Sequence, residues 1–490
     1  MIEKKEVELK LELPGDCVSG FREVAALGDP ERRPVRQKTT YFDTPQGQLR
    51  KAGYSLRLRR KGRSCLQTVK HREAESGGFS SRAEWEQKVE GPDLDFAALR
   101  ATPLAELLTK RDLRKRLCVV SETIVQRTTW TLRRGRASIE LILDEGEVVS
   151  GERREPVCEI ELELKKGRPD ALFGLAREIA GQVPLRMGVS SKSERGFRLL
   201  EGKAKRVRKA EPTRLGRDMT IADAFAAIVQ SCLRHYRLNE TILLEERNAS
   251  ALHQARVAIR RLRSAFTLFR PVLAGEPYDR LRGALRGFAE TLGDARNLDV
   301  LLASQPGSAA PRGEAAALHK DLRRARKQAY ATVSTALHDR ALPILILDIV
   351  AWAEAGAWRK GGRAGHPVPE FAAERLERGW RRVRKGGADI AALSPEERHR
   401  LRIEIKKLRY AAEFFASLAP RDKKAEQRAF LAELEAIQES LGRLNDLETA
   451  KEIAPGLAAA REEETEDSAA DLKAAQEAHR RLREVGRYWR

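Results

Sequence analysis

Cysteines are few in this 490-residue chain, and they form no pattern typical of a cross-linked or zinc-binding fold. The five cysteines are scattered, and no C-x-x-C pair occurs among them. Disulfide frameworks need several paired cysteines, and structural zinc sites need closely spaced ones. The cysteine content therefore argues against both and favours a reducing compartment.

Long apolar runs are also lacking. The most apolar stretch, residues 341–353, contains Pro343 and Asp348, and it is shorter than the roughly 20 residues that a membrane-spanning helix needs. The chain does not open with the basic and then apolar segments of a signal peptide. We expect residues 341–353 to form a buried helix of a cytoplasmic protein that has no membrane partner.

The charge of the chain is strongly positive. Basic residues outnumber acidic ones by 93 to 72, which gives a formal net charge of +21. This excess favours a polyanionic partner, which could be nucleic acid, an anionic membrane surface or polyphosphate. Aromatic residues make up only 6% of the chain, and few of them alternate with the basic segments, so base stacking by nucleic acid has little support.

An inverted charge pattern opens the chain. Residues two apart on a strand share a face, so a strand at residues 6–10 places Glu6, Glu8 and Lys10 on one face and aliphatic residues on the other. A single E-x-E-x-K segment is equally compatible with a solvated edge strand. The same inversion recurs, however, in residues 56–59, 84–86, 138–144 and 159–164. Many such strands predict a closed antiparallel barrel with a charged lumen and an outward apolar face.

Turn signals divide the first part of the chain into further expected strands. These are residues 41–43, 54–60, 65–70, 82–89, 124–133, 137–144, 147–150 and 155–165. A polar helical segment at residues 96–115 interrupts the series. Hairpin-linked strands in this order predict an antiparallel barrel with helical packing elements.

A lumen that contains both cations and carboxylates predicts the kind of ligand it binds. Burial of many charges is costly unless they pair or bind ions. Arginine and lysine suit a chain of phosphates, whereas carboxylates suit a hard divalent cation that bridges protein and phosphate oxygens. The pattern therefore predicts a metal-assisted phosphate site inside the barrel.

Five motifs in this region together resemble the CYTH family, the triphosphate tunnel metalloenzymes. They are residues 6–10, 40–44, 53–59, 158–164 and 190–196. The resemblance implies a tunnel barrel over residues 1–202 that hydrolyses inorganic tripolyphosphate with Mg²⁺ or Mn²⁺. It leaves two alternatives open. One is a non-catalytic polyphosphate-binding protein, and the other is an adenylate cyclase, an activity that the family also contains.

The resemblance also implies roles for individual lumen residues. The metal-binding carboxylates would be Glu6, Glu8, Glu159, Glu161 and Glu163. The phosphate-binding cations would be Lys10, Arg57, Arg59, Lys70, Arg127 and Lys192. All of these cations except Arg127 would form the catalytic set together with Glu6 and Glu8. The roles of four further lumen candidates are not separated by the sequence: Glu84, Glu86, Glu140 and Asp144.

The second half of the chain contains an internal repeat. A basic linker, residues 203–216, precedes a segment with helical periodicity almost throughout. The block H-x-x-R-x-x-x-[RK]-[RK]-L-R occurs at residues 253–263 and again at 399–409, and each copy is followed by a related Leu-Gly segment. Two copies predict a helical domain with pseudo-two-fold symmetry, made of two small helical bundles at about residues 217–345 and 346–490. The whole chain is therefore expected to belong to the α+β class.

Each block places basic side chains on one helix face. Positions 0, +3, +7 and +10 fall within one stripe when each residue advances by about 100°. The two stripes are His253, Arg256, Arg260 and Arg263, and His399, Arg402, Lys406 and Arg409. A solvated face explains either stripe alone, but the matched register favours a row of phosphates, and we expect no carboxylate to neutralise either stripe.

Residues 217–490 resemble the CHAD domain, the conserved histidine α-helical domain, through these two blocks. The resemblance implies that the helical half consists of two related four-helix bundles and that it binds inorganic polyphosphate across a basic surface. We therefore expect a cytoplasmic protein that associates with polyphosphate granules.

Overall fold

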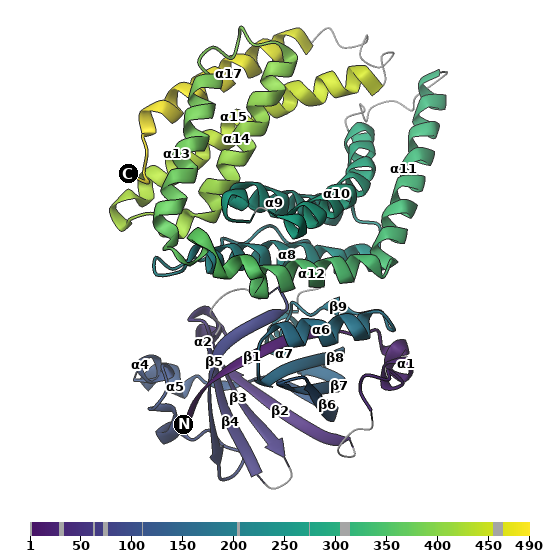
Figure 1. Cartoon of the computed structure of the whole chain (residues 1–490), viewed down its shortest axis with the longest axis vertical. Helices are drawn as coiled ribbons and strands as arrows, with labels where there is room; N and C mark the ends of the chain where they lie inside the picture. The colour runs from purple at the N-terminus through teal and green to yellow at the C-terminus, as the bar shows by residue number, and fades with distance from the viewer. Residues whose placement is uncertain are drawn as a thin grey trace. The chain divides into compact units, whose positions relative to one another are not determined.

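The computed structural model describes residues 2–28, 34–61, 64–71, 77–109, 111–202, 206–273, 275–303, 314–453 and 464–490. The chain divides into two compact units. The first unit comprises Met1–Arg208, Arg237–Glu246 and Leu337–Ala355, and the second comprises Lys209–Tyr236, Arg247–Ala336 and Gly356–Arg490. Figure 1 shows that the first unit holds the strands and that the second is helical. The limits of the two predicted domains and of the linker stay predictions.

Eight antiparallel strands close into a barrel in the first unit. They are β1 (Ile2–Glu12), β2 (Val35–Asp43), β3 (Tyr54–Lys61), β4 (Ser64–His71), β5 (Phe79–Val89), β6 (Cys118–Arg134), β7 (Ala137–Ser150) and β8 (Arg153–Lys166). Their order is β5-β4-β3-β2-β6-β7-β8-β1, and pairing of β1 with β5 closes the ring. A short ninth strand, β9 (Arg186–Met187), pairs with the end of β1. The predicted closed antiparallel barrel is confirmed.

The predicted inversion of the charge pattern is also confirmed. In the register of β1 and β8, Lys10 lies opposite Glu161, so both side chains share the lumen face. The aliphatic residues between the charged positions, such as Leu9 and Leu162, are fully buried. They pack outward, and the charged residues occupy the lumen.

Short helices cover the outer face of the barrel (Figure 1). They are α1 (Val18–Arg22), α2 (Gln48–Lys51), α3 (Phe96–Leu99), α4 (Leu104–Leu108), α5 (Arg111–Lys115) and α6 (Asp170–Ala180). One apolar cluster packs the four helices α2, α3, α4 and α5 against the outside of β3, β4 and β5. Its buried residues are Leu49, Leu56, Val69, Trp85, Leu99, Leu104 and Leu113. Burial of this apolar area stabilises the outer layer. A further short helix, α7 (Lys192–Leu200), packs against the lumen side of β6, β7 and β8, where its Leu199 contacts Val125, Val148 and Val157.

The predicted break between a strand at residues 137–144 and a strand at residues 147–150 is wrong. β7 is a single strand, whereas two strands were expected on either side of Glu145 and Gly146. A Cβ atom on Gly146 would lie 2.1 Å from the carbonyl oxygen of Ile124 on β6. Glycine therefore allows the two strands to approach within the barrel, and it does not mark a turn here.

The most apolar helix, α12 (Ala341–Ala355), is part of the first unit. In the described part of the chain, one segment, Ala341–Lys360, is long and apolar enough to cross a membrane by length and composition alone. α12 nevertheless buries Leu347 and Val350, and its Asp348 accepts a 2.6 Å hydrogen bond from Arg177 of α6. The expected buried helix is confirmed.

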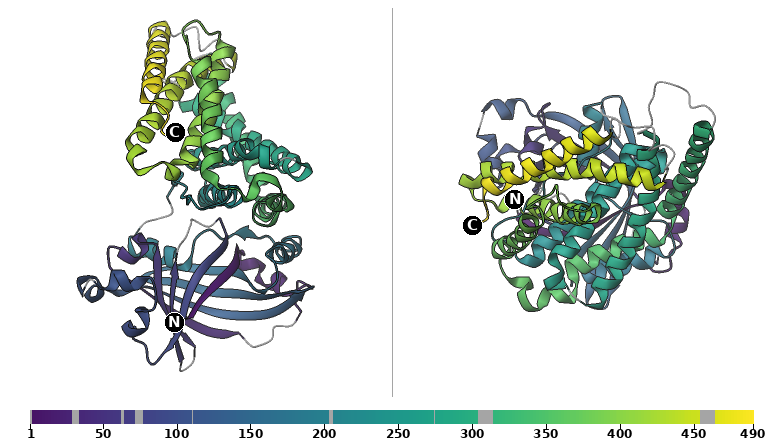
Figure 2. Two further views of the ribbon diagram at one scale, coloured as in Figure 1. Left: turned by 60° about the vertical axis from the view of Figure 1, so that its left-hand side comes forward. Right: turned by 90° about the horizontal axis from the view of Figure 1, so that it is seen from above.

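The second unit is built mainly from long helices. They are α8 (Ile221–Glu245), α9 (Ala249–Leu273), α10 (Glu276–Ala303), α11 (Glu314–His338), α13 (Val368–Gly386), α14 (Pro395–Phe414), α15 (Lys424–Ile453) and α17 (Glu464–Val485). The last residues of α8, from Arg237, and of α11, from Leu337, belong to the first unit. In Figure 2 the yellow α17 lies along the yellow-green α15. Aromatic rings, including Phe269 and Phe371 with centroids 4.9 Å apart, form part of its core. The arrangement of these helices as two four-helix bundles stays a prediction.

Candidate functional site

Three carboxylates converge in the barrel lumen and form what we call the acidic cluster. Asp144 of β7 lies opposite Glu159 of β8, and Glu161 follows on the same face two residues later. One ligand oxygen from each of the three lies within 4.8 Å of the other two. Asp144 and Glu159 are 0% and 1% exposed. Because carboxylate oxygens are the preferred ligands of hard divalent cations, the acidic cluster could hold Mg²⁺ or Mn²⁺.

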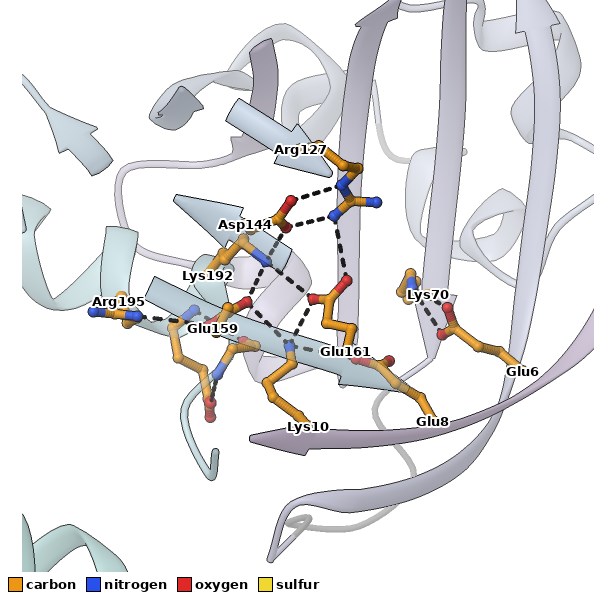
Figure 3. Close-up of polar contacts among 12 residues, drawn as sticks. Glu6, Glu8, Lys10, Lys70, Arg127, Asp144, Glu159, Glu161, Lys192 and Arg195 are labelled. Carbon is orange, nitrogen blue, oxygen red and sulfur yellow. Dashed lines mark hydrogen bonds and ion pairs between the residues drawn. The ribbon is translucent and has the colours of Figure 1, made fainter. Parts of the chain in front are cut away.

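Arg127 and Lys10 neutralise part of the acidic cluster (Figure 3). Arg127 donates to Asp144 through Nε at 2.7 Å and Nη2 at 2.5 Å, and Lys10 Nζ lies 3.3 Å from Glu161 and 3.7 Å from Glu159. Burial alone would raise the pKa of Glu161, but the surrounding cations hold it well below its ordinary range. Burial alone would likewise lower the pKa of Lys10, yet the carboxylates raise it. Both groups are therefore charged at neutral pH.

Lys192 reaches the acidic cluster from the first turn of α7. Ser191 and Glu194 form a capping box that starts this helix. The Lys192 ammonium lies 2.8 Å from Asp144 and 3.0 Å from Glu161, and it also bonds Glu159. Lys192 therefore contacts all three members of the acidic cluster.

Ion pairs attach the rest of α7 to the barrel. Arg195 donates to Glu155 of β8 at 2.7 Å, and Arg198 donates to the other oxygen of the same carboxylate at 2.5 Å. Burial would raise the pKa of Glu155, but the two arginines lower it. These contacts fix the helix that carries Lys192.

A second charged group of residues lies around Glu6. Lys70 donates to both carboxylate oxygens of Glu6, at 2.9 Å and 2.7 Å, and also lies 3.1 Å from Glu84. Arg57 donates to Glu84 at 3.2 Å. Burial would raise the pKa of Glu6, yet the neighbouring cations, Lys70 first, lower it. The structure thus places Glu6 with lysine and arginine, apart from the acidic cluster.

Arg82 is a lumen residue that sequence reasoning missed. It lies directly opposite Glu6 in the register of β1 and β5 and donates to Glu6 at 3.2 Å and to Glu8 at 3.0 Å. A signal was present, since Arg82 precedes Glu84 by two residues and so shares its strand face. The predicted inverted pattern on this strand covered residues 84–86 and so did not include Arg82.

Arg59 differs from the other lumen cations. It faces the lumen from β3, and it makes no ion pair with any residue that the structure describes. Its Nε and that of Arg57 are buried without a hydrogen-bond partner there. Burial, together with the charges of Arg57 and Arg127, lowers the pKa of Arg59 to about 10. Arg59 can therefore bind an anionic ligand that enters the lumen.

Other predicted lumen residues lie outside the acidic cluster. Lys165 Nζ is 2.7 Å from Glu163 and 3.0 Å from Glu140, and Glu86 accepts a 3.2 Å hydrogen bond from Thr68. The predicted metal-binding carboxylates therefore fall into three places: Glu159 and Glu161 with Asp144, Glu6 and Glu8 with Arg82, and Glu163 with Lys165. Their individual roles stay predictions.

The two predicted stripes of the second unit make equivalent contacts. A Cβ atom on Gly293 of α10 would be 3.6 Å from the Arg256 guanidinium, and one on Gly442 of α15 would be 3.9 Å from that of Arg402. We call these the two Arg–Gly contacts. Each joins the histidine block of one copy to its own Leu-Gly segment, so the sequence repeat corresponds to a repeated packing contact.

The expectation that no carboxylate neutralises either stripe is wrong for Arg409. Its Nη1 donates to Glu413, one helical turn further on, at 2.5 Å. Arg260 donates to the Tyr410 hydroxyl at 2.8 Å, which links α9 to α14. Burial and the neighbouring arginines lower the pKa of His253, which favours a neutral imidazole at neutral pH.

Comparisons with known proteins match both halves of the chain. The model of the CYTH domain family matches residues 4–197, and that of the CHAD domain family matches residues 227–455. An inorganic triphosphatase from Haemophilus influenzae is 28% identical over 197 residues, which are 40% of this chain and 55% of the relative. The chain therefore spans about half the length of this curated relative.

Two solved structures are also similar to parts of the chain. The CHAD domain from the plant Ricinus communis is 29% identical, with a TM-score of 0.45, and the match covers 58% of this chain and 99% of that one. A putative adenylyl cyclase from Hippeastrum, described as having a dominant triphosphatase activity, is 22% identical, with a TM-score of 0.33. That match covers 41% of this chain and 97% of the other.

Proposed function

Residues 4–197 of this chain are a CYTH domain and residues 227–455 are a CHAD domain, and from this premise we propose that it is a metal-dependent inorganic triphosphatase. The reaction would be hydrolysis of tripolyphosphate to pyrophosphate and phosphate. The observation that carries the proposal is the juxtaposition, in one closed lumen, of the acidic cluster and of Arg59, a cation without a carboxylate partner in the described chain.

The lumen cations would bind the substrate. Tripolyphosphate is a short chain of negative charges, and guanidinium groups bind phosphate oxygens through paired hydrogen bonds. Arg57 and Arg59 both have a buried Nε without a partner in the described chain. Their side chains therefore offer donors that a phosphate group can satisfy.

The acidic cluster fits a divalent cation, because it offers three carboxylates with converging oxygens, two of them buried and the third partly buried. Asp144, Glu159 and Glu161 would hold Mg²⁺ or Mn²⁺, which would neutralise charge on the phosphate oxygens. Positioning and neutralisation are what phosphoryl transfer chiefly needs from a protein.

Glu8 is the carboxylate that we assign to proton transfer. Its Oε1 is buried, accepts no hydrogen bond from the residues that the structure describes and lies 3.6 Å from the Lys10 ammonium, whereas its Oε2 accepts a hydrogen bond from Arg82. In the reaction the water oxygen bonds to the terminal phosphorus, the bond from that phosphorus to the bridging oxygen breaks, and pyrophosphate leaves. Glu8 Oε1 would accept the proton that the water loses.

The helical half would bind longer phosphate chains. Its two stripes occupy equivalent positions, as the paired Arg–Gly contacts indicate. We propose that the CHAD domain binds inorganic polyphosphate and so keeps the barrel near its substrates, in the cytoplasm or on polyphosphate granules.

Phosphate release from tripolyphosphate, with Mg²⁺ and then with Mn²⁺, tests the proposal. We expect Glu161→Gln to lower metal-dependent release by about 100-fold or more. Glu147→Gln is the matched control, because Glu147 lies on β7 but pairs with Arg154 at 2.5 Å, with both side chains partly exposed. Tight binding of tripolyphosphate without release would leave a non-catalytic binding protein. Formation of cyclic AMP from ATP, without tripolyphosphate hydrolysis, would favour a cyclase.

A further inference from the structure

The Lys192 ammonium lies among the same carboxylates that could hold a metal ion (Figure 3). It is 2.8 Å from Asp144 Oδ2 and 3.0 Å from Glu161 Oε1, and it bonds Glu159 Oε1. Among the described residues, Lys192 is the one cation that forms ion pairs with all three. Arg127 reaches two of them, and Lys10 reaches a different two.

One set of oxygens cannot serve both cations at once. Mg²⁺ coordinates oxygen ligands at about 2.0 to 2.1 Å, closer than the ammonium approaches Asp144 and Glu161. The two positive charges would also repel each other strongly in a lumen from which water is largely excluded. We infer that Lys192 is a built-in competitor of the divalent cation: its ammonium occupies the acidic cluster when no metal is bound and leaves the cluster when one binds.

The surrounding structure favours movement of the side chain over movement of the helix. α7 is fixed by its capping box and by the pairs of Arg195 and Arg198 with Glu155. The four-carbon stem of Lys192 is flexible, so its ammonium can move while the backbone stays in place. Bound phosphate offers the displaced ammonium a new partner.

Coupling between metal and phosphate follows from this competition. The inference rests on the proposed function, since it concerns the same metal and phosphate site. Metal alone has to displace Lys192 without compensation, whereas bound phosphate stabilises the displaced ammonium. By linkage, phosphate then increases the affinity for metal, and metal increases the affinity for phosphate by the same factor.

Binding of Mn²⁺ alone to the full-length chain tests the inference, with free Mn²⁺ measured by electron paramagnetic resonance. We expect Lys192→Met and Lys192→Gln to bind Mn²⁺ about tenfold or more tightly than the wild type, because a competing charged contact is lost. Gln retains a hydrogen-bond donor for the carboxylates, so it is the variant better suited to fold without metal. Lys165→Met is the control, since it removes one lumen charge that pairs with Glu163 and Glu140, and we expect its affinity to stay within about twofold of the wild type.

Equal Mn²⁺ affinity in the wild type and both Lys192 variants would overturn the inference. A crystal structure of the wild type with Mn²⁺ provides a test that does not depend on the variants. Mn²⁺ at the acidic cluster with Lys192 displaced supports the inference, and Mn²⁺ bound there while Lys192 still contacts all three carboxylates contradicts it. Failure to hydrolyse tripolyphosphate would overturn the proposed function but would leave these Mn²⁺ affinities and positions unchanged, so the two failures are distinguishable.

Discussion

Gly196 of α7 lies against Ser121 of β6 so closely that a Cβ atom on Gly196 would be 2.1 Å from Ser121 Oγ and 2.5 Å from Ser121 Cβ. Side-chain atoms cannot approach to such distances, so a larger residue at this position would push the helix away from β6. Lys192 lies one turn earlier on the same helix. The Gly196–Ser121 contact therefore sets how deeply the Lys192 ammonium reaches into the lumen.

Gly196→Ala should displace α7 and misplace Lys192. We expect metal-dependent phosphate release from tripolyphosphate to fall by about 100-fold, because displacements of about 1 Å are costly in a preorganised site. The overpacked contact should also lower stability by about 1 to 3 kcal/mol, measured by thermal unfolding.

Gly174→Ala on α6 is the matched control, because nothing lies within 4 Å of the added methyl group. Ser121→Gly, combined with Gly196→Ala, removes the atoms with which the new methyl group collides, so the double variant should regain part of the lost activity. Full activity of Gly196→Ala alone would show that the depth of α7 does not matter.

Arg59 and Arg127 both line the lumen, but their loss should have opposite effects on stability. Arg59→Gln removes a cation that burial and two neighbouring arginines disfavour, so the melting temperature should not fall. Arg127→Gln removes both hydrogen bonds that Arg127 donates to the buried Asp144, which then keeps its ion pair with Lys192, and should cost about 3 kcal/mol. Thermal unfolding of the two variants measures the difference.

The affinity of Arg59→Gln for tripolyphosphate provides a second test of the role of Arg59. Arg59→Gln should weaken tripolyphosphate binding about tenfold or more, since a charged hydrogen bond to phosphate is lost. Calorimetric titration in metal-free buffer measures this affinity. A fall in the melting temperature of Arg59→Gln without weaker binding would contradict the assignment of Arg59 as an anion site.

The lowered pKa of Arg59 also predicts a pH dependence. With its pKa lowered to about 10, the guanidinium of the ligand-free protein begins to lose its proton near pH 10, whereas bound phosphate favours the charged form. Its contribution to tripolyphosphate binding should therefore be complete below pH 10 and decline as the pH rises above it. Its effect on folding has the opposite sign. The folded pKa lies below the ordinary value of 12.5, so the charged group destabilises the fold below pH 10, and the penalty is relieved at higher pH.

Dissociation constants for tripolyphosphate, measured on both sides of pH 10, check this dependence. Protonation changes of the substrate and of other groups affect the dissociation constants of the wild type and of Arg59→Gln equally, so they cancel in the ratio of the two constants. The ratio of the two dissociation constants should therefore fall towards one as the pH rises. A ratio that stays constant across this range would show that Arg59 keeps its charge.

The strand faces of the barrel could be predicted from the sequence, but the contacts between strands could not. The period of two placed Glu6, Glu8 and Lys10 in the lumen correctly because it depends only on neighbours in the chain. Which cations meet Glu6 depends on register, and Arg82 is 76 residues away from it. The composition of the acidic cluster is likewise a matter of register between β7 and β8, which places Asp144 opposite Glu159.

Two predictions were wrong, one at Gly146 in the barrel and one at Arg409 in the second basic stripe. Two strands were predicted on either side of residues 145 and 146, whereas the structure has one strand there and uses Gly146 for close contact with the neighbouring strand. The stripe at Arg409 was interpreted as unneutralised because only its own positions were considered. Glu413 lies one turn further on and reaches back to Arg409, so a helical stripe has to be examined together with its i+4 neighbours.

The two Arg–Gly contacts predict that both repeats contribute to polyphosphate binding. We expect the double variant Arg256→Gln/Arg402→Gln to bind long-chain polyphosphate about 100-fold more weakly, because two charged contacts to phosphate are lost. Since the contacts are equivalent in the two copies, each single variant should account for about half of the change in binding free energy. Titration of the full chain with polyphosphate measures all three.

A matched double variant separates the stripes from net charge. Arg324→Gln/Arg480→Gln also removes one arginine from each repeat, but these side chains are 83% and 58% exposed and pair with acidic residues on their own helices. Because exposed pairs of this kind contribute little, this control should keep polyphosphate affinity within about threefold of the wild type. Equal losses in the two double variants would mean that the overall positive charge attracts polyphosphate. A loss confined to Arg256→Gln/Arg402→Gln would instead assign binding to the paired stripes, since both proteins carry the same net charge.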